Sequence, residues 1–377
     1  MRAASIFAGI GGFDLAAQRL GVHVEMQAEI DRSAASVLRA QFPGVRLEVD
    51  ATTADLGDAD LVMAGFPCQG LSTAAATPRG QGLFDPDSPS SVVWAALSRV
   101  FRAQPRYLLL ENADSLSSGR YMEDLRVLLQ LLEDKGYHTH VFALNSGCYG
   151  SLMRRTRTFV LARRAPWARP ETGKGLGWTC AVEGIGVNNQ QGGGLFCCQP
   201  SVTKKAATYT LMVTRDEVRT LTPEAVETLF GYPPGWTAAA GSANARYMRL
   251  GNSVSVDAAT AALSLLLHGK AEMRVPTGAY ADLYPLTVPA TGGAAGSAFG
   301  RIMRGRTRGG ALCAGNTNTL EVEYCAPVYE AWMHQHADEV SPAMWGYLET
   351  MRASMRKYLE YPKAWPMTAR VEMRQRG

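Results

Sequence analysis

The sequence lacks several features that would place it in common protein classes. No stretch of its 377 residues approaches the roughly 20 consecutive apolar residues that span a bilayer, which argues against a membrane protein. The seven cysteines are odd in number and none forms a CxxC pair, so neither a disulfide scaffold nor a zinc site is indicated. The phosphate-binding pattern GxxxxGK[ST] is missing, which argues against ATP chemistry. The first 13 residues indicate a buried strand and a turn, not a signal peptide.

The composition is that of a folded protein in a reducing compartment. Hydrophobic residues make up 46% of the chain and charged residues 19%, which is too apolar for a disordered chain. At about 150 residues per domain, the length predicts two or three domains. The cysteine pattern favours the cytoplasm, where a special cysteine would act as a nucleophile and not form a bridge.

Positive charge is concentrated in the middle of the chain. The net charge is only +4, yet residues 151–220 hold eleven Lys or Arg against four acidic residues. Such a local excess favours a phosphate-bearing partner, but a solvated face would have the same composition. The charge alone leaves both interpretations open.

Strand-like and helix-like segments alternate along the first 165 residues. Apolar runs predict strands at Ala4–Ala8, His23–Ile30, Val45–Val49, Asp60–Phe66, Tyr107–Leu110, Thr139–Leu144 and Thr158–Ala162. Helical spacing predicts helices at Phe13–Leu20, Arg32–Phe42, Ser91–Phe101 and Met122–Leu132. Because the strands are almost continuously apolar, we expect an α/β fold with a doubly wound, mostly parallel sheet.

The pattern changes after Arg164. Residues 165–218 are rich in Gly, Gln, Asn, Thr and Lys, and Gln190–Gly194 predicts a flexible loop. Helical periodicity returns at Thr222–Phe230 and Ser255–Leu267, and residues 286–300 resemble a Gly/Ala-rich linker. A last helix is expected from Ser341, with an apolar stripe that favours core packing over a partner interface.

Two acidic residues follow a glycine-rich turn. Phe7–Gly12 joins the first strand to the first helix, where glycine lets a ligand approach the backbone. Glu29 lies 18 residues after Gly11, near the spacing at which an acid binds a ribose, and Asp50 follows the third strand. Together they predict a nucleoside-bearing cofactor at the carboxyl ends of the strands.

Candidate catalytic groups follow later strands. Cys68 lies in a Pro-containing loop after a strand, where a nucleophile or a small buried apolar residue would both fit. Glu111 and Asn112 end the strand that begins at Tyr107, so the Glu111 carboxyl could act as an acid beside Cys68. Arg155 and Arg157 have alternate spacing that could point both to one face, or could mark a solvated surface.

In this order the motifs resemble those of the cytosine-C5 DNA methyltransferases. The resemblance runs from Ser5 to about Leu267, roughly two thirds of the chain. The matching segments are Phe7–Gly12, Glu29, Asp50, Gly65–Gln69, Glu111–Asn112, Arg155–Arg157, Leu221–Glu224, Gly231–Pro233 and Leu250–Val254. Each motif is common by itself, and the ordered set is specific.

The resemblance implies S-adenosyl-L-methionine (AdoMet) as cofactor and S-adenosyl-L-homocysteine as its product. Glu29 would hold the ribose, Asp50 the adenine amino group, and Leu250–Val254 would complete the pocket. The expected cofactor-binding residues are Phe7, Ala8, Gly9, Ile10, Gly11, Gly12, Glu29, Ile30, Asp50, Ala51, Pro67, Asn252, Ser253 and Val254.

The resemblance also implies a covalent mechanism on a cytosine that is flipped out of duplex DNA. The Cys68 thiolate would add to C6, Glu111 would share a proton with N3, and Arg157 would donate to O2. Arg155 would position the loop or the base. The expected substrate contacts are Phe66, Pro67, Gln69, Ser72, Asn112, Lys174, Lys204 and Lys205.

Several residues depart from the family pattern. Ala113 stands where Val is usual, Leu152-Met153 where Pro-Gln is usual, and Leu71 where Phe is common, while Ser88–Trp94 matches its motif poorly. These departures keep alternatives open: an RNA cytosine substrate, a larger group transferred from a modified AdoMet, or a DNA-binding relative without turnover.

The predicted organisation has three parts. Residues 1–164, completed by 246–268, would bind AdoMet, residues 165–245 would form a small target-recognition region, and 271–377 a C-terminal extension. The cluster Arg301–Arg308 could add DNA contacts, or the extension could simply pack on the smaller domain. Duplex DNA is the expected partner, a cognate restriction endonuclease is possible in principle, and a monomer is the default.

Overall fold

The computed structural model describes residues 1–69, 71, 82–117, 119–151, 153, 155–172, 184–187, 211–214, 218–272 and 283–289. The predicted loop at Gln190–Gly194, the cluster Arg301–Arg308 and the predicted helix from Ser341 lie outside these residues.

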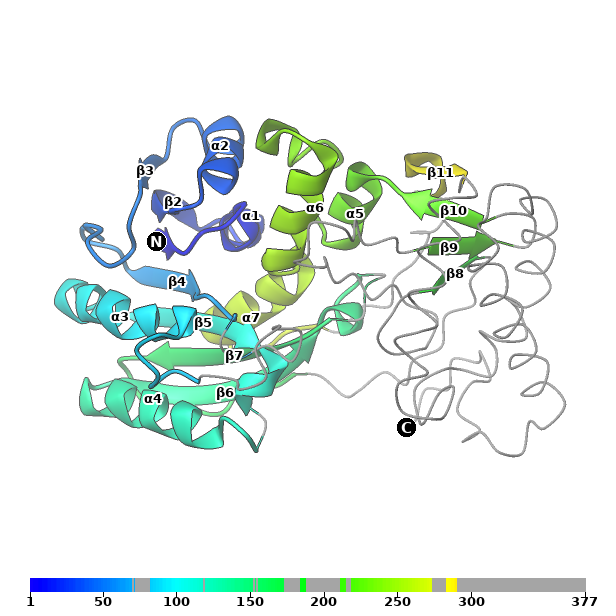
Figure 1. Ribbon diagram of the computed structural model, residues 1–377. Coiled ribbons are helices and arrows are strands. Elements are labelled where there is room, and N and C mark those ends of the chain that lie inside the picture. The colour runs from blue at the N-terminus through cyan, green and yellow to red at the C-terminus, as the bar shows by residue number, and fades with distance from the viewer. Residues whose placement is uncertain are drawn as a thin grey trace, which may run out of the picture.

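A seven-stranded sheet forms the centre of the described part of the chain (Figure 1). Its strands are β1 (Arg2–Ile6), β2 (His23–Ala28), β3 (Arg46–Glu48), β4 (Leu61–Gly65), β5 (Tyr107–Ala113), β6 (His138–Asn145) and β7 (Thr156–Arg163). Their order is β3-β2-β1-β4-β5-β7-β6, and the first five are parallel. Only β7 runs antiparallel to its neighbours β5 and β6. The predicted doubly wound, mostly parallel α/β fold is therefore confirmed.

Helices cover both faces of this sheet and give it two apolar cores. α1 (Gly12–Arg19), α2 (Arg32–Gln41) and α7 (Val256–His268) pack on one face, and α3 (Val92–Ala103) and α4 (Met122–Asp134) on the other. Side chains alternate along β4 accordingly: Leu61 and Met63 enter the first core, while Val62 and Ala64 enter the second. A strand buried on both faces must be apolar throughout, which explains the continuous runs in the sequence.

Two further helices bring a later part of the chain against the glycine-rich turn. α5 (Pro223–Leu229) and α6 (Ala243–Asn252) precede α7, with Thr222 capping α5 and Ser242 capping α6. In the segment between them, the Trp236 indole N–H donates to the Ile10 carbonyl at 2.8 Å. The stretch Ala243–His268 is long and apolar enough for a membrane span, but 67% of its apolar window is buried and it holds two separate helices, so it is core.

A second, antiparallel sheet was not expected from the sequence. Its order is β11-β10-β9-β8, with β8 (Gly184–Val187), β9 (Leu211–Thr214), β10 (Val218–Leu221) and β11 (Thr287–Pro289). The linker predicted at residues 286–300 is wrong at its start, because Thr287–Pro289 pairs with Arg219–Leu221. A three-residue strand without apolar alternation gives too weak a pattern to detect.

Candidate active site

The glycine-rich turn that follows β1 contains residues with positive φ values. Gly9 and Gly11 have φ values of +58° and +85°, and Phe7 has the unusual value of +53°. A Cβ added to Gly11 would lie 2.5 Å from the Phe42 ring, whereas one added to Gly9 would meet nothing within 4 Å. The backbone at Gly9 therefore borders open space that a ligand can approach.

Glu29 closes this turn from the neighbouring strand. It follows β2 directly, and its Oε2 accepts a hydrogen bond from the Gly9 N–H at 2.7 Å. Its Oε1 accepts from the Asp31 N–H at 2.8 Å. Burial raises the pKa of Glu29, while these two hydrogen bonds act against the rise. Each carboxylate oxygen has a second lone pair, so the group can still accept hydroxyl donors.

The residues beside Glu29 differ in exposure. Ile30 is 72% exposed, which is unusual for a large apolar side chain next to a buried acid. Asp50 is half-buried, and its Oδ1 accepts from the backbone N–H and the hydroxyl of Thr52, both at 2.8 Å. Ala51 is buried beside it.

Asn112 fixes the loop that carries Cys68. Its amide Nδ2 donates to the carbonyls of Phe66 and Pro67 at 3.0 and 3.4 Å. Its Oδ1 accepts from the Ala113 N–H, and the side chain is only 1% exposed. The Asn112 amide nitrogen therefore holds the loop, and the expected substrate contact of Asn112 stays a prediction.

Glu111 and Arg157 form a largely buried ion pair beside this loop. Glu111 lies within β5, which extends three residues beyond its predicted end, and Arg157 lies on β7. The Arg157 Nε is 3.3 Å from the Glu111 Oε1, and the side chains are 16% and 12% exposed. Burial raises the pKa of Glu111, opposed by the charges of Arg157 and Arg155. A carboxyl with this balance can hold a proton for a reacting base.

The Cys68 thiol lies in the electrostatic field of this pair. Burial raises its pKa, Arg157 lowers it, and the charge of Glu111 raises it. The parallel pairing of β4 with β5 explains the proximity, because Gly65 is opposite Glu111 just before the Cys68 loop. The structure thus brings Cys68, Glu111 and Arg157 together. The sequence pattern predicts the shared sheet edge for Cys68 and Glu111 only.

Arg155 has a different environment from Arg157. Its Nη2 donates to the carbonyls of Gly251 and Ser253 at 2.8 and 2.9 Å, and its guanidinium lies over the Phe230 ring. Arg155 is buried and joins β7 to the turn before α7. These contacts hold the segment Leu250–Val254 against β7, and the charge of Arg155 also lowers the pKa of Glu111 and of Cys68.

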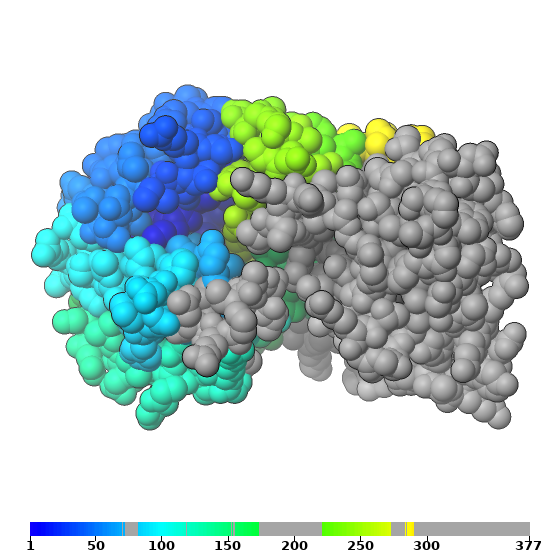
Figure 2. All heavy atoms as spheres, viewed as in Figure 1, coloured from blue at the N-terminus to red at the C-terminus, as the bar shows by residue number. Residues whose placement is uncertain are grey.

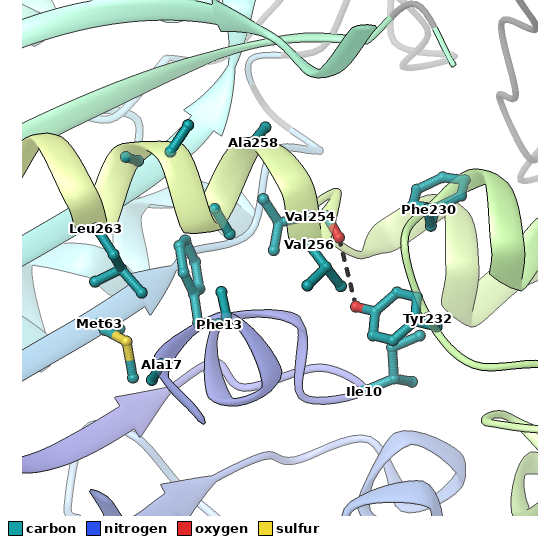
Figure 3. Close-up of a cluster of buried hydrophobic side chains, with 14 of the residues drawn as sticks. Ile10, Phe13, Ala17, Met63, Phe230, Tyr232, Val254, Val256, Ala258 and Leu263 are labelled. Carbon is teal, nitrogen blue, oxygen red and sulfur yellow. Dashed lines mark hydrogen bonds between the residues drawn. The ribbon is translucent and has the colours of Figure 1, made fainter. Parts of the chain in front are cut away.

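The turn between α6 and α7 packs directly on the glycine-rich turn. Figure 3 shows Val254 above α1 and Tyr232 above Ile10, which precedes α1. The Tyr232 hydroxyl donates to the Val254 carbonyl at 3.4 Å. A Cβ added to Gly12 would lie 2.5 Å from the Tyr232 hydroxyl oxygen and 2.7 Å from Val254 Cγ1. Ser253 and Val254 are therefore held next to Phe7–Gly12, with Asn252 at the end of α6.

Some expected substrate residues cannot be placed. Ser72, Lys174, Lys204 and Lys205 lie outside the described residues, while Gln69, directly after Cys68, is exposed. Among the residues that are described, no three His, Cys, Asp or Glu side chains gather as a metal site would require.

Sequence reasoning missed the ion pair between Arg249 and Asp31. Arg249 Nη1 is 2.7 Å from Asp31 Oδ2, two residues from Glu29. No local pattern indicates such a pair, because α6 and the start of α2 are far apart in the chain. The only signal in the sequence that could have indicated this pair is the position of Arg249, directly before the motif Leu250–Val254.

Known proteins are similar to this chain in sequence and in fold. The family model for C-5 cytosine-specific DNA methylase matches residues 1–173. The type II methyltransferase M2.BsuMI of Bacillus subtilis is 28% identical over 289 residues, covering 68% of this chain and 72% of the relative. The first 173 residues of this chain are therefore similar to the C-5 cytosine-specific DNA methylases. Members of this family depend on AdoMet.

Other relatives match mainly the first part of the chain. The type II methyltransferase M.HgiCII of Herpetosiphon aurantiacus is 34% identical over 161 residues, which cover 41% of this chain but only 36% of the relative. Two solved structures have a TM-score of 0.53: the methyltransferase EhMeth of Entamoeba histolytica, at 16% identity, and a DNMT2 variant of Spodoptera frugiperda, at 18%. They cover 71% and 70% of this chain, with 98% and 99% of their own. At these identities they show the fold alone.

Proposed function

We propose that this protein transfers a methyl group from AdoMet to C5 of a cytosine in duplex DNA, through a covalent bond between Cys68 and C6. The observation that carries the proposal is the grouping of Cys68 with the buried Glu111–Arg157 pair at the carboxyl ends of β4 and β5. Cytosine C5 is a weak nucleophile, and addition of a thiolate to C6 makes it an enamine that can attack an electrophile.

Each group of the cluster has a distinct task in this reaction. Cys68 forms the bond to C6 as the thiolate, which the charge of Arg157 favours. The raised pKa of Glu111 suits a carboxyl that donates a proton to N3 as charge builds on the ring. Arg157 donates to O2 and stabilises the same charge. A base then takes the C5 proton, N3 returns its proton to Glu111, and the thiolate leaves, which restores the aromatic ring.

The residues around Gly9 suit AdoMet. The open space beside Gly9 lets a ligand contact the main chain. The Glu29 carboxylate can accept the two ribose hydroxyls, and the exposed Ile30 side chain can pack against the adenine base. When bound, AdoMet supplies an electrophilic methyl group. Phe7–Gly12, Glu29, Ile30, Asp50, Ala51, Pro67 and Asn252–Val254 would hold it.

Duplex DNA would lie against the loop that carries Cys68. The target atom is inaccessible inside a duplex, so the cytosine must be flipped out. Gln69, exposed beside Cys68, would contact the strand. Residues 165–245 and the cluster Arg301–Arg308 remain proposed recognition and DNA-contact regions. A cytoplasmic location, a monomeric state and a restriction endonuclease partner also remain proposals.

Nucleoside mass spectrometry tests this function. Purified protein is incubated with AdoMet and unmodified duplex DNA, and in parallel with RNA, and the digested nucleosides are weighed. We expect a gain of one methyl group on deoxycytidine that disappears in Cys68→Ala. A parallel incubation with a modified AdoMet that carries a larger group tests that alternative, since Ala113 leaves a small side chain opposite Arg157.

The remaining outcomes of this experiment overturn the proposal. Methylation of RNA cytidine alone would change the substrate class. DNA binding without any change in mass would identify a binding protein that has lost turnover.

A further inference from the structure

A cation from the late part of the chain lies beside the cofactor pocket. Arg249, in the last turn of α6, pairs with Asp31, which caps α2 by accepting the Ala34 N–H at 2.9 Å. The Arg249 side chain is only 16% exposed, and its buried Nε has no hydrogen-bond partner among the described residues. Figure 2 shows the light-green segment around α6 lying directly against the blue N-terminal part.

Two hydrogen bonds connect this pair to the glycine-rich turn. The backbone N–H of Asp31 donates to one oxygen of Glu29, and the other oxygen accepts from Gly9. Arg249, Asp31, Glu29 and Gly9 thus form one continuous chain of contacts. It runs from α6 to the backbone atom that borders the open space.

Asp31 and Arg249 act on the Glu29 carboxyl with opposite signs. Beyond burial, the charge of Asp31 raises the pKa of Glu29 and the charge of Arg249 lowers it. Other charged groups lie on the neighbouring elements, and most of them have partners of their own. On β3, Arg46 pairs with Glu48 at 2.8 Å, and on α6, Arg246 pairs with Glu224 and Glu227 at 2.6 and 2.8 Å. After β3, Asp50 accepts from Thr52, and Arg32 begins α2.

We propose that Arg249 is a positioning residue for the cofactor, acting through Asp31 on the carboxylate of Glu29. The inference rests on the proposed function, because it takes AdoMet as the ligand of this pocket. Arg249 balances the charge of Asp31, so that Glu29 can stay ionised in a buried place and accept both the Gly9 N–H and the ribose hydroxyls. The packing of α6 against the start of α2 therefore affects the affinity for the cofactor.

Calorimetric binding of S-adenosyl-L-homocysteine to the full chain between pH 5 and pH 9 tests this role without requiring turnover. Arg249→Gln removes the cation and leaves Asp31 unbalanced, which raises the pKa of Glu29 further. We expect Kd to rise about three- to tenfold at pH 7. Affinity should recover as the pH rises, so its acid midpoint moves to higher pH.

The partner variant should move the midpoint the other way. Asp31→Asn keeps a side chain that can cap α2 but removes the anion that raises the pKa of Glu29. Binding should therefore persist to lower pH than in the natural protein. Opposite shifts from the two halves of one ion pair are not expected from a loss of packing, which would weaken binding equally at all pH values.

A second Arg–Asp pair provides the matched control. Arg19 and Asp257 join α1 to α7 at 2.9 Å, away from Glu29. Arg19→Gln and Asp257→Asn should leave Kd and its pH midpoint unchanged. The inference is overturned if Arg249→Gln has the same acid midpoint of binding as the natural protein. It is also overturned if Arg19→Gln shifts this midpoint as much as Arg249→Gln does. If the natural protein binds no S-adenosyl-L-homocysteine at any pH, the proposed function itself fails.

Discussion

At the residue scale, the state of Cys68 is set by two opposed neighbours. Desolvation favours its neutral thiol, Arg157 favours the thiolate, and ionised Glu111 opposes the thiolate. The same Glu111 carboxyl has a raised pKa, so protonation of Glu111 would remove its opposition. In the proposed reaction, a proton on Glu111 would therefore favour the Cys68 thiolate and be available to N3 of the cytosine.

Alkylation of Cys68 measures this balance directly. Because the thiolate is the reactive form, Glu111→Gln should raise the rate of Cys68 alkylation by iodoacetamide at pH 7.5, and Arg157→Gln should lower it. Each change should be about two- to tenfold, since a pKa shift of one unit changes the thiolate fraction about tenfold. Peptide mass spectrometry distinguishes Cys68 from the other six cysteines.

Cys68→Ala is the negative control, because its peptide has no thiol at position 68 that iodoacetamide can alkylate. Changes of the same sign in both variants would indicate altered access to the thiol and would contradict the electrostatic account.

At the scale of elements, the turn before α7 packs against the start of α1. Gly12 begins α1, and the space that a Cβ would fill is occupied by the Tyr232 hydroxyl and Val254. Arg155 holds the same turn from the other side through the carbonyls of Gly251 and Ser253. Two buried contacts therefore fix one short turn between β7 and α1.

Gly12→Ala should destabilise the protein by ~1–3 kcal/mol, the usual cost of an extra methyl group in a tightly packed place. Adding Tyr232→Phe removes the hydroxyl oxygen 2.5 Å from the new Cβ and should restore part of the loss. Urea unfolding measures both changes.

Gly44→Ala is the control, because a Cβ there meets nothing within 4 Å and should change stability little. If Tyr232→Phe restores nothing, the clash lies elsewhere and this account of the turn is wrong.

At the scale of the whole molecule, the sequence predicts the central sheet better than the rest. The apolar runs at Asp60–Phe66 and Tyr107–Leu110 correspond to β4 and β5. Strands that are buried on both faces are apolar throughout, so their composition predicts them well. The second sheet had no such signal. Gly184–Val187 alternates glycine with single apolar residues, and β11 has three residues, so pairing of distant segments decides their structure.

The candidate site divides in the same way. Cys68 and Glu111 could be brought together from the sequence because parallel strands deliver their carboxyl ends to one edge. The different environments of Arg155 and Arg157 could not be predicted from the sequence. They depend on where the segment with Gly251 and Ser253 packs against the sheet. Asn112 was expected at the substrate, yet its amide supports the Cys68 loop from within.

The central claim is a covalent bond between Cys68 and cytosine C6, and trapping that bond tests it most directly. Fluorine at C5 blocks loss of the C5 substituent, so the thiolate cannot leave after methyl transfer. Incubation with AdoMet and duplex DNA containing 5-fluorocytosine should give a denaturation-resistant complex. Its mass should equal protein plus DNA plus one methyl group, with the link at the Cys68 peptide. Absence of the complex in the natural protein, or its persistence in Cys68→Ala, would contradict the account.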